Sequence, residues 1–304
     1  MSVEDPTLQE SDGNLLSSAA LREQKERSLW VDALRRFSRH WSGVMGLVIL
    51  LGVIVLAVGA PLFTDVDPTA MNAMQLLQTP SAEHRFGTDD YGRDLFSRVL
   101  YGSRISLTVG LVVAGITTVT GVFIGAVAGF YPRLDEPIMR AMDILMALPT
   151  IMFALAIVAV LGPRLVNVII ALIFPITPRT ARVVRGVVLA LKQEDFVLAA
   201  RCVGARDLRL IVRHVLPNCL APIIVRQTYV VGIAILAEGG LNFLGVGVEL
   251  QTPTLGGIVS EARIHLRAAP WASLYGGLFM ALLVLSVNLL GDALRDVLDP
   301  RMKV

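Results

Sequence analysis

Residues 193–218 read Gln193-Glu-Asp-Phe-Val-Leu-Ala-Ala-Arg-Cys-Val-Gly-Ala-Arg-Asp-Leu-Arg-Leu-Ile-Val-Arg-His-Val-Leu-Pro-Asn218, a polar island between long apolar runs. The pattern predicts a helix, a break and a second helix. Gly204 supplies the break, because a residue without a Cβ atom tolerates the backbone that ends a helix. Asp207 is the expected N-cap of the second helix, and Pro217 is expected to stop it before the next apolar run.

The second helix of this island is amphipathic. An apolar stripe follows the i, i+3, i+4, i+7 spacing: Leu208, Ile211, Val212 and Val215. Another face carries Arg206, Arg209 and Arg213. Such a helix lies flat at an interface, and small residues beside it would let the backbone of a second protein come close: Ala199, Ala200, Gly204 and Ala205. The alternative is a solvated loop between two spans.

Composition places the whole chain in a membrane. Its 304 residues are 54% hydrophobic and 17% charged, with a mean hydropathy of +0.66, which is too apolar for an ordinary soluble domain. The net charge is only +2, and basic residues are spread through the loops, so nucleic acid is not an expected partner. Cys202 and Cys219 give no disulfide framework.

Six apolar runs predict an all-α protein with six transmembrane helices. They cover approximately residues 43–63, 105–131, 144–163, a run that starts near 165, 220–247 and 271–291. Pro149 is an expected kink, and Pro175 and Pro178 interrupt the fourth run. The predicted organisation is a polar N-terminal segment at 1–40 and a transmembrane domain at 41–304, with outer loops at 64–104 and 248–270 and a short inner turn at 132–140.

The distribution of positive charge predicts the orientation. Lys and Arg are more numerous on the side that carries the 193–218 island than on the other side. By the positive-inside rule, the island and both termini are cytoplasmic.

A few residues within the predicted spans have candidate roles. Gly121, Gly125 and Gly129 form a small-x3-small series that predicts close helix packing. Glu238 and Asn242 lie on one helical face and are candidates for a translocation path or an inter-subunit contact, and Asn288 is a third path candidate. We interpret Arg226 as snorkelling toward the cytoplasmic surface.

Several motifs of enzymes do not occur. The chain has no Gly-x4-Gly-Lys-Ser/Thr phosphate loop and no hydrolase signature. Its four histidines, at positions 40, 84, 214 and 265, have no metal-ligand spacing. We therefore expect no enzymatic activity, no metal site and no cofactor in this chain.

The 193–218 island resembles the coupling loop of the membrane subunits of bacterial ABC importers. The shared arrangement is Ala-Ala-x3-Gly-x9-His-x-Leu-Pro, with Leu198 where the family usually has Glu and His214 where it usually has Ile. The resemblance implies a type I ABC importer permease fold, in which this loop sits in a cleft of an ATPase subunit. The residues that it would assign to coupling are Ala199, Ala200, Arg201, Gly204, Ala205, Arg206 and Pro217.

Three more stretches, at 84–98, 102–107 and 288–300, resemble the second membrane subunit of dipeptide and oligopeptide importers. Residues 251–256, Gln-Thr-Pro-Thr-Leu-Gly, differ from the Pro-Pro-x-Pro-x-Trp-Gly run of relatives, in a loop expected to meet the binding protein. The resemblance implies a subunit of the bacterial inner membrane that forms half of a peptide pathway. Its implied partners are a paralogous permease, two ATPase subunits that bind ATP and Mg²⁺, and an extracytoplasmic binding protein.

Other functions remain open at this point. The same architecture could import nickel, opines or glutathione, although no His or Cys cluster along the spans favours a metal. A stand-alone secondary transporter would need ionisable residues near the middle of the membrane and internal repeats, and only Glu238 fits. A structural membrane protein would explain the spans but not the matching loops.

Overall fold

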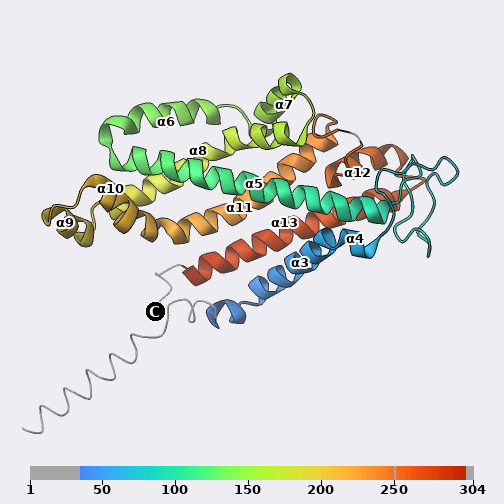
Figure 1. The fold of residues 1–304 in the computed structure, drawn as a ribbon, viewed down its shortest axis with the longest axis horizontal. Helices are drawn as coiled ribbons and strands as arrows, with labels where there is room; N and C mark the ends of the chain where they lie inside the picture. The colour runs from blue at the N-terminus through green and yellow to red at the C-terminus, as the bar shows by residue number, and fades with distance from the viewer. Residues whose placement is uncertain (1–34, 250, 299–304) are drawn as a thin grey trace, which may run out of the picture.

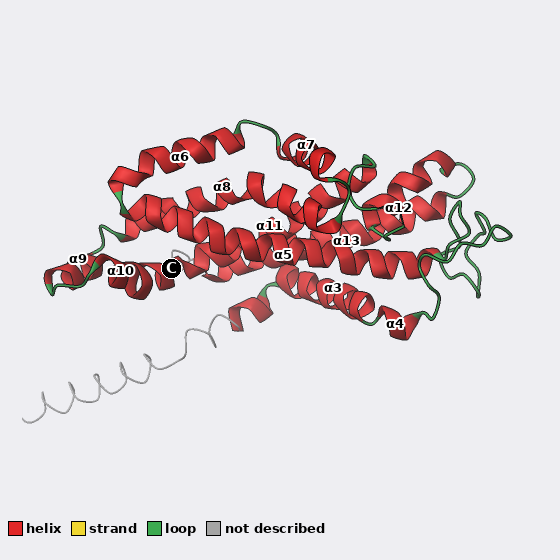
Figure 2. Ribbon diagram, turned by 45° about the horizontal axis from the view of Figure 1, so that its top comes forward, coloured by secondary structure: helices red, strands yellow, loops and turns green. Residues whose placement is uncertain are grey.

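The computed structural model describes residues 35–249 and 251–298, which form a bundle of helices with loops at its ends (Figure 2). The long helices are α3 (Trp41–Val58), α5 (Leu95–Phe130), α8 (Leu165–Leu191), α11 (Leu216–Phe243) and α13 (Pro270–Leu298). The shorter ones are α4 (Ala60–Phe63), α6 (Pro132–Met146), α7 (Thr150–Leu161), α9 (Asp195–Cys202), α10 (Asp207–Leu210) and α12 (Leu255–Ala262). A π-helical turn, η1 (Ile211–Val215), joins α10 to α11, and a 3₁₀ turn, η2 (Arg263–His265), follows α12.

The two ends of the bundle differ. Helices α9 and α10 project from one end, and the loop at 64–94 lies with α12 at the other (Figure 1). The start of α3 packs on the last turns of α13, where a Cβ on Gly43 would lie 2.5 Å from the Cβ of Ala293. The first and last described residues therefore lie together, toward the end that carries α9.

The helices meet the requirements for crossing a bilayer. Within the described residues, five helical segments are long and apolar enough: α3, α5, α8, the continuous α10–η1–α11 helix and α13. Helices α6 and α7 together pass the same test but are bent by 81°, so counting them as one span gives six. The predicted all-α transmembrane fold is confirmed.

Helix α5 begins ten residues earlier than the predicted second span. Asp94 is its N-cap and accepts a hydrogen bond from the backbone N–H of Ser97 at 2.8 Å. The sequence interpretation placed residues 95–104 in the outer loop, at the surface, yet the side chain of Arg98 is only 1% exposed. Its guanidinium pairs with Glu261 of α12 at 2.9 Å, which allows a charged residue to be buried in the helix.

The predicted inner turn at 132–140 is wrong, because these residues form most of α6. Pro132 lies in the first turn of that helix. Backbone N–H groups in the first turn have no acceptor within the helix, so the missing N–H of proline costs no hydrogen bond there. Two ion pairs then hold α6 against α8, Arg185 with Asp135 and Arg182 with Asp143, both at 2.5 Å. The break between α6 and α7 falls at 147–149, so Pro149 is confirmed as the bend, at the N-cap of α7.

Two predictions about proline are wrong. Helix α8 continues through Pro175 and Pro178, both of which are buried. Pro217 does not end a helix either, because α10, η1 and α11 form one continuous run. A proline ring clashes with the carbonyl one α-helical turn before it, and the wider π turn just before Pro217 relieves that clash.

The loop at 248–270 contains a helix that the sequence interpretation did not include. Thr254 is the N-cap of α12, and its hydroxyl accepts a hydrogen bond from the N–H of Gly257 at 3.0 Å. Gly256 lies so close to the backbone of Gly239 in α11 that a Cβ atom would not fit. Helix α12 is therefore packed directly on the end of a membrane span.

Candidate functional site

Helix α9 and the turn after it form the candidate site. Gly204 has φ +89°, a backbone conformation that favours glycine, so the predicted break is confirmed. The N–H of Gly204 donates to the carbonyl of Arg201 at 2.9 Å, and that of Ala205 donates to the carbonyl of Ala200 at 3.1 Å. These bonds close α9 and turn the chain back into α10, at the far end of the bundle (Figure 1).

One apolar side chain of α9 is inserted into the bundle. Val197 is 1% exposed and belongs to an apolar cluster that includes Phe130 of α5 and Val188 of α8. The same cluster contains Leu210 of α10 and Val215 of η1. Val197 thus belongs to an apolar core that is shared by three long helices, α5, α8 and α11.

Two cations add to this attachment. The Lys192 ammonium donates to the carbonyl of Phe130 at 2.6 Å and lies 5.1 Å from the centre of its ring. The Arg201 guanidinium lies 5.8 Å from the same ring. Phe130, at the end of α5, thus contacts the chain just before α9 and the last turn of α9.

The outer face of α9 and its turn is small and uncovered. Ala199, Arg201, Gly204 and Arg206 are exposed, and Ala200 and Ala205 are half-buried. Exposed apolar side chains lie beside them, Leu198 at 45% and Val203 at 89%. Pro217 is exposed but lies within the continuous α10–η1–α11 helix. This surface offers backbone and apolar side chains to a partner, and its coupling role stays a prediction.

The amphipathic stripe was predicted in the wrong register. Leu208 and Val212 are 72% and 56% exposed, whereas Leu210, Ile211 and Val215 are buried. The π turn at Ile211–Val215 rotates the side chains relative to an α-helix, so the α-helical spacing does not hold across it. Asp207 is also not the N-cap, because Arg206 holds that position and Asp207 lies in the first turn.

The path candidates Glu238 and Asn242 are buried inside the subunit. Ser106 of α5 donates a hydrogen bond to the Glu238 carboxylate at 2.9 Å, and the Asn242 amide donates to the same carboxylate. The Asn242 side-chain oxygen accepts from the N–H of Val248 at 2.7 Å. Asn288 lies against Gly232 at the contact between α13 and α11. Their role in the path stays a prediction, and the contacts described are all within one chain.

A second polar site lies at the opposite end, the outer ion-pair network of Asp89, Arg93, Arg98 and Glu261. Arg93 pairs with Asp89 at 2.6 Å and with Glu261 at 2.7 Å, and Arg98 pairs with Glu261 at 2.9 Å. Burial raises the pKa of Glu261, against the opposing effect of the Arg98 and Arg93 guanidinium groups. The sequence interpretation did not include this network, because the partner Glu261 is far away along the chain.

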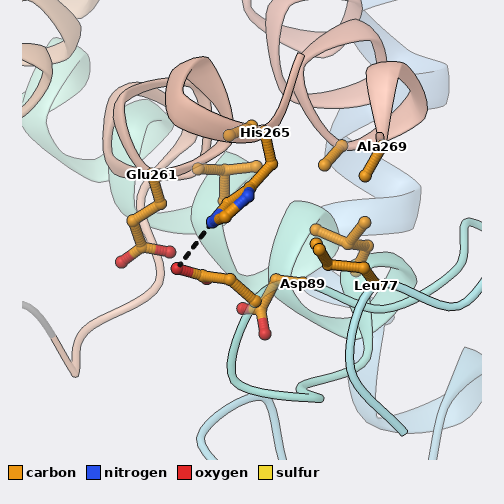
Figure 3. A pocket seen from close by; sticks show the side chains of 10 residues that line it. Leu77, Asp89, Glu261, His265 and Ala269 are labelled. Carbon is orange, nitrogen blue, oxygen red and sulfur yellow. Dashed lines mark ion pairs between the residues drawn. The ribbon is translucent and has the colours of Figure 1, made fainter. Parts of the chain in front are cut away.

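Asp90 and His265 lie beside this network in a small pocket (Figure 3). Their ion-pair distance is 3.9 Å, and burial followed by the Asp89 carboxylate raises the pKa of Asp90. Oxygens of Asp89, Asp90 and Glu261 lie within 4.8 Å of one another, as metal ligands would. However, Arg93 and Arg98 already bind two of these carboxylates, so a metal ion here would meet two positive charges.

The chain matches the model of the binding-protein-dependent transport system inner membrane component over residues 121–304. It also matches the N-terminal transmembrane domain of oligopeptide transport permease C over residues 28–80. It belongs to this family of permease subunits. The predicted membership of the permease family is thereby confirmed, and the protein is a multi-pass component of the inner membrane.

Several permease subunits of other bacteria are similar in sequence to this chain along most of its length. It is 43% identical over 277 residues to the dipeptide transport system permease protein DppC of Alkalihalophilus pseudofirmus, covering 91% of each chain. It is 40% identical over 300 residues to the di/tripeptide transport system permease protein DppC of Pseudomonas aeruginosa, covering 96% of each chain. It is 37% identical over 281 residues to the oligopeptide transport system permease protein OppC of Bacillus subtilis, covering 92% of each.

The outer ion-pair network of the permease leads to a stability prediction. Glu261→Ala would leave Arg98 buried without its main partner, and we expect a loss of about 3–5 kcal/mol in the free energy of unfolding. Thermal unfolding of the detergent-solubilised complex measures the effect. Glu83→Ala, which removes an exposed glutamate outside the network, is the control. Equal melting temperatures for the two variants would contradict the assigned role of Glu261.

Proposed function

We propose that this permease subunit forms half of the translocation pathway of an ATP-driven importer of peptides. The observation that carries the proposal is a small, exposed helix, α9, anchored by Val197 in the core shared by α5, α8 and α11. The names of the relatives, which are dipeptide, di/tripeptide and oligopeptide permeases, support peptides as the cargo. The other half of the pathway would be a paralogous permease subunit.

The movement of the ATPase subunits would be passed to the permease through α9. Two ATPase subunits, which bind ATP and Mg²⁺, would hold the surface around Ala199, Ala200 and Gly204. Their closure would move α9 and, through Val197 and the apolar cluster around it, the inner ends of the long helices. Packed cores switch between discrete arrangements, so such a displacement changes which side of the pathway is open.

The proposed orientation places the α9 end in the cytoplasm. The start of α3 and the end of α13 lie toward that end, which would make both termini cytoplasmic. The outer end, with the 64–94 loop and α12, would then face the extracytoplasmic binding protein that delivers the peptide. The excess of Lys and Arg around the 193–218 loop supports this orientation.

Purification of the intact complex tests the proposal. The tagged chain, extracted in mild detergent, is expected to bring a second permease and two ATP-binding chains with it. The reconstituted complex, supplied with its binding protein, is expected to accumulate a radiolabelled dipeptide only in the presence of ATP. Purification of an active carrier without any nucleotide-hydrolysing partner would overturn the proposal.

A bulky residue on the exposed face of α9 should separate docking from folding. Ala199→Trp adds an indole at an exposed position of α9, and it leaves the left-handed backbone of Gly204 unchanged. We expect normal membrane insertion, at least about a tenfold loss of co-purified ATPase, and no transport. Ala82→Trp makes the same change at an exposed position of the outer loop and should retain the ATPases. Normal transport by Ala199→Trp would show that this face of α9 is not the docking surface.

A further inference from the structure

A layer of polar side chains crosses the middle of the bundle. Thr117 of α5 contacts Gln227 of α11, with 3.4 Å between the hydroxyl and the side-chain oxygen. One turn further along α5, the space above Gly121 is filled by Thr180 of α8. Arg226 of α11 adjoins Gln227 along the chain. These four side chains, Thr117, Thr180, Arg226 and Gln227, are called the polar layer below.

Arg226 is deep in the bundle. It lies near the middle of the continuous helix that runs from Asp207 to Phe243. Its Nε and Nη2 atoms are buried against the protein. The interpretation of Arg226 as a snorkelling side chain stays a prediction, although two nitrogens of its head group are covered by the protein.

The polar layer has hydrogen-bond donors without acceptors. In the described part of the chain, Nε and Nη2 of Arg226, Nε2 of Gln227 and the hydroxyl of Thr180 are buried and have no partner. Arg179, exposed on α8, adjoins Thr180 along the chain. Among the described residues, no acidic side chain forms an ion pair with either arginine, although Arg182 and Arg185 of the same helix both have one.

An unpaired guanidinium covered by membrane-spanning helices is expensive, and such groups characteristically line a substrate path or face a partner. The ligand that fits must supply negative charge to Arg226 and Arg179, and further acceptor oxygens to Gln227 and Thr180. A carboxylate followed by amide carbonyls has this chemistry. An acidic side chain of a neighbouring subunit would neutralise the arginines but would bring no row of acceptors.

We propose that Arg226, assisted by Arg179, is a binding site for the C-terminal carboxylate of the peptide as it crosses the membrane. The inference rests on the proposed function as a peptide importer, and it names the part of the substrate that this subunit holds. The side chain of Arg226 is half-buried, with two of its nitrogens covered. Full engagement thus requires α8 and α11 to move apart as the pathway opens. A contact completed only in that state holds the peptide transiently, which suits conduction.

Uptake by variants of the reconstituted importer tests the site. The probe is a radiolabelled dipeptide, with substrate-stimulated ATP hydrolysis measured alongside. Arg226→Gln is expected to reduce dipeptide uptake at least about tenfold, because it removes a charge-assisted hydrogen bond, whereas Arg226→Lys should stay within about threefold of the parent. Arg182→Gln, which removes an arginine already paired with Asp143, is the matched control and should transport normally.

The outcomes separate this inference from the proposed function. If the parent complex transports no dipeptide, the proposed function itself fails. If the parent complex transports the dipeptide and Arg226→Gln is equally active, the carboxylate site is overturned. It is also overturned if Arg226→Gln and Arg226→Lys lose the same fraction of uptake. Loss of the second permease from purified Arg226→Gln complex would also overturn it, since the arginine would then be a subunit contact.

Accessibility provides a readout that does not depend on the transport rate. Thr180→Cys, which leaves Arg226 in place, is combined with Cys202→Ser, because Cys202 is the exposed native cysteine and Cys219 is buried. We expect a water-soluble thiol reagent to modify residue 180 when the pathway opens, and saturating dipeptide to slow the modification at least about fivefold, a protection that Arg226→Gln should remove. A cysteine that never reacts, or that reacts at the same rate with and without dipeptide while Arg226 is present, would show that the polar layer lies outside the peptide path.

Discussion

Gly125→Val is expected to prevent the permease from forming a stable bundle. A Cβ atom on Gly125 would lie 2.8 Å from the Cβ of Val184 and closer still to the carbonyl oxygen of Ala181. The neighbour is helix backbone, which cannot rotate away as a side chain can. Overpacking of a core ordinarily costs about 1–3 kcal/mol, and a collision with backbone should reach at least the upper end of that range.

The same helix offers a matched control for this change. Gly115 is exposed on α5, and a Cβ atom there would meet nothing within 4 Å. Gly115→Val keeps the propensity penalty of valine in a helix but adds no collision. The yield of monodisperse complex and its melting temperature should fall for Gly125→Val and stay near the parent for Gly115→Val. Similar stability for both variants would mean that α5 and α8 do not pack through Gly125.

Val197→Asp is expected to abolish transport while leaving insertion and the pairing of permeases intact. The side chain is 1% exposed within the apolar cluster beneath α9, so an aspartate would either bury an unpaired charge or pull the helix away from the bundle. Burial of an ionised carboxylate without a partner costs several kcal/mol, more than one short helix gains from its attachment. Helix α9 should therefore detach, and the ATPases should lose their mechanical connection to the spans.

The measurement for Val197→Asp compares peptide uptake with ATP hydrolysis in the same proteoliposomes. We expect uptake to fall below about a hundredth of the parent value, with residual ATP hydrolysis that no longer responds to the loaded binding protein. Val197→Ala keeps the site apolar and removes only part of the side chain, so its defect should be mild. Normal coupled transport by Val197→Asp would show that the attachment of α9 is not the route of the power stroke.

The elements predicted correctly from sequence are those set by local chemistry. The length of the apolar runs predicted the membrane spans, because a helix needs about twenty apolar residues to cross a bilayer. Gly204 marked a turn, because a left-handed backbone favours a residue without Cβ. The spacing of the 193–218 island, together with the stretches at 84–98, 102–107 and 288–300, pointed to the family that the comparisons established.

The errors came from residues whose environment is set by distant parts of the chain. Residues 95–104 were assigned to the outer loop at 64–104, but they form the start of α5, where Arg98 is buried in an ion pair with the distant Glu261. Helix α8 passes through two prolines because neighbouring helices enclose them, and the π turn moves Leu208 and Val212 to the surface. Helix propensity depends only on residues that are close along the chain, so it predicts neither effect.

The amino-acid sequence on its own determined that this chain crosses a membrane several times and presents one polar hairpin between its fourth and fifth spans, because hydrophobic length and glycine act locally. Only the tertiary structure decided that α9 is anchored through Val197, that α12 is joined to α5 by buried ion pairs, and that Arg226 lies unpaired in the middle of the bundle. Those features depend on which side chains meet across helices. The free energy of a charge or an apolar group depends on that environment, not on its neighbours in the chain.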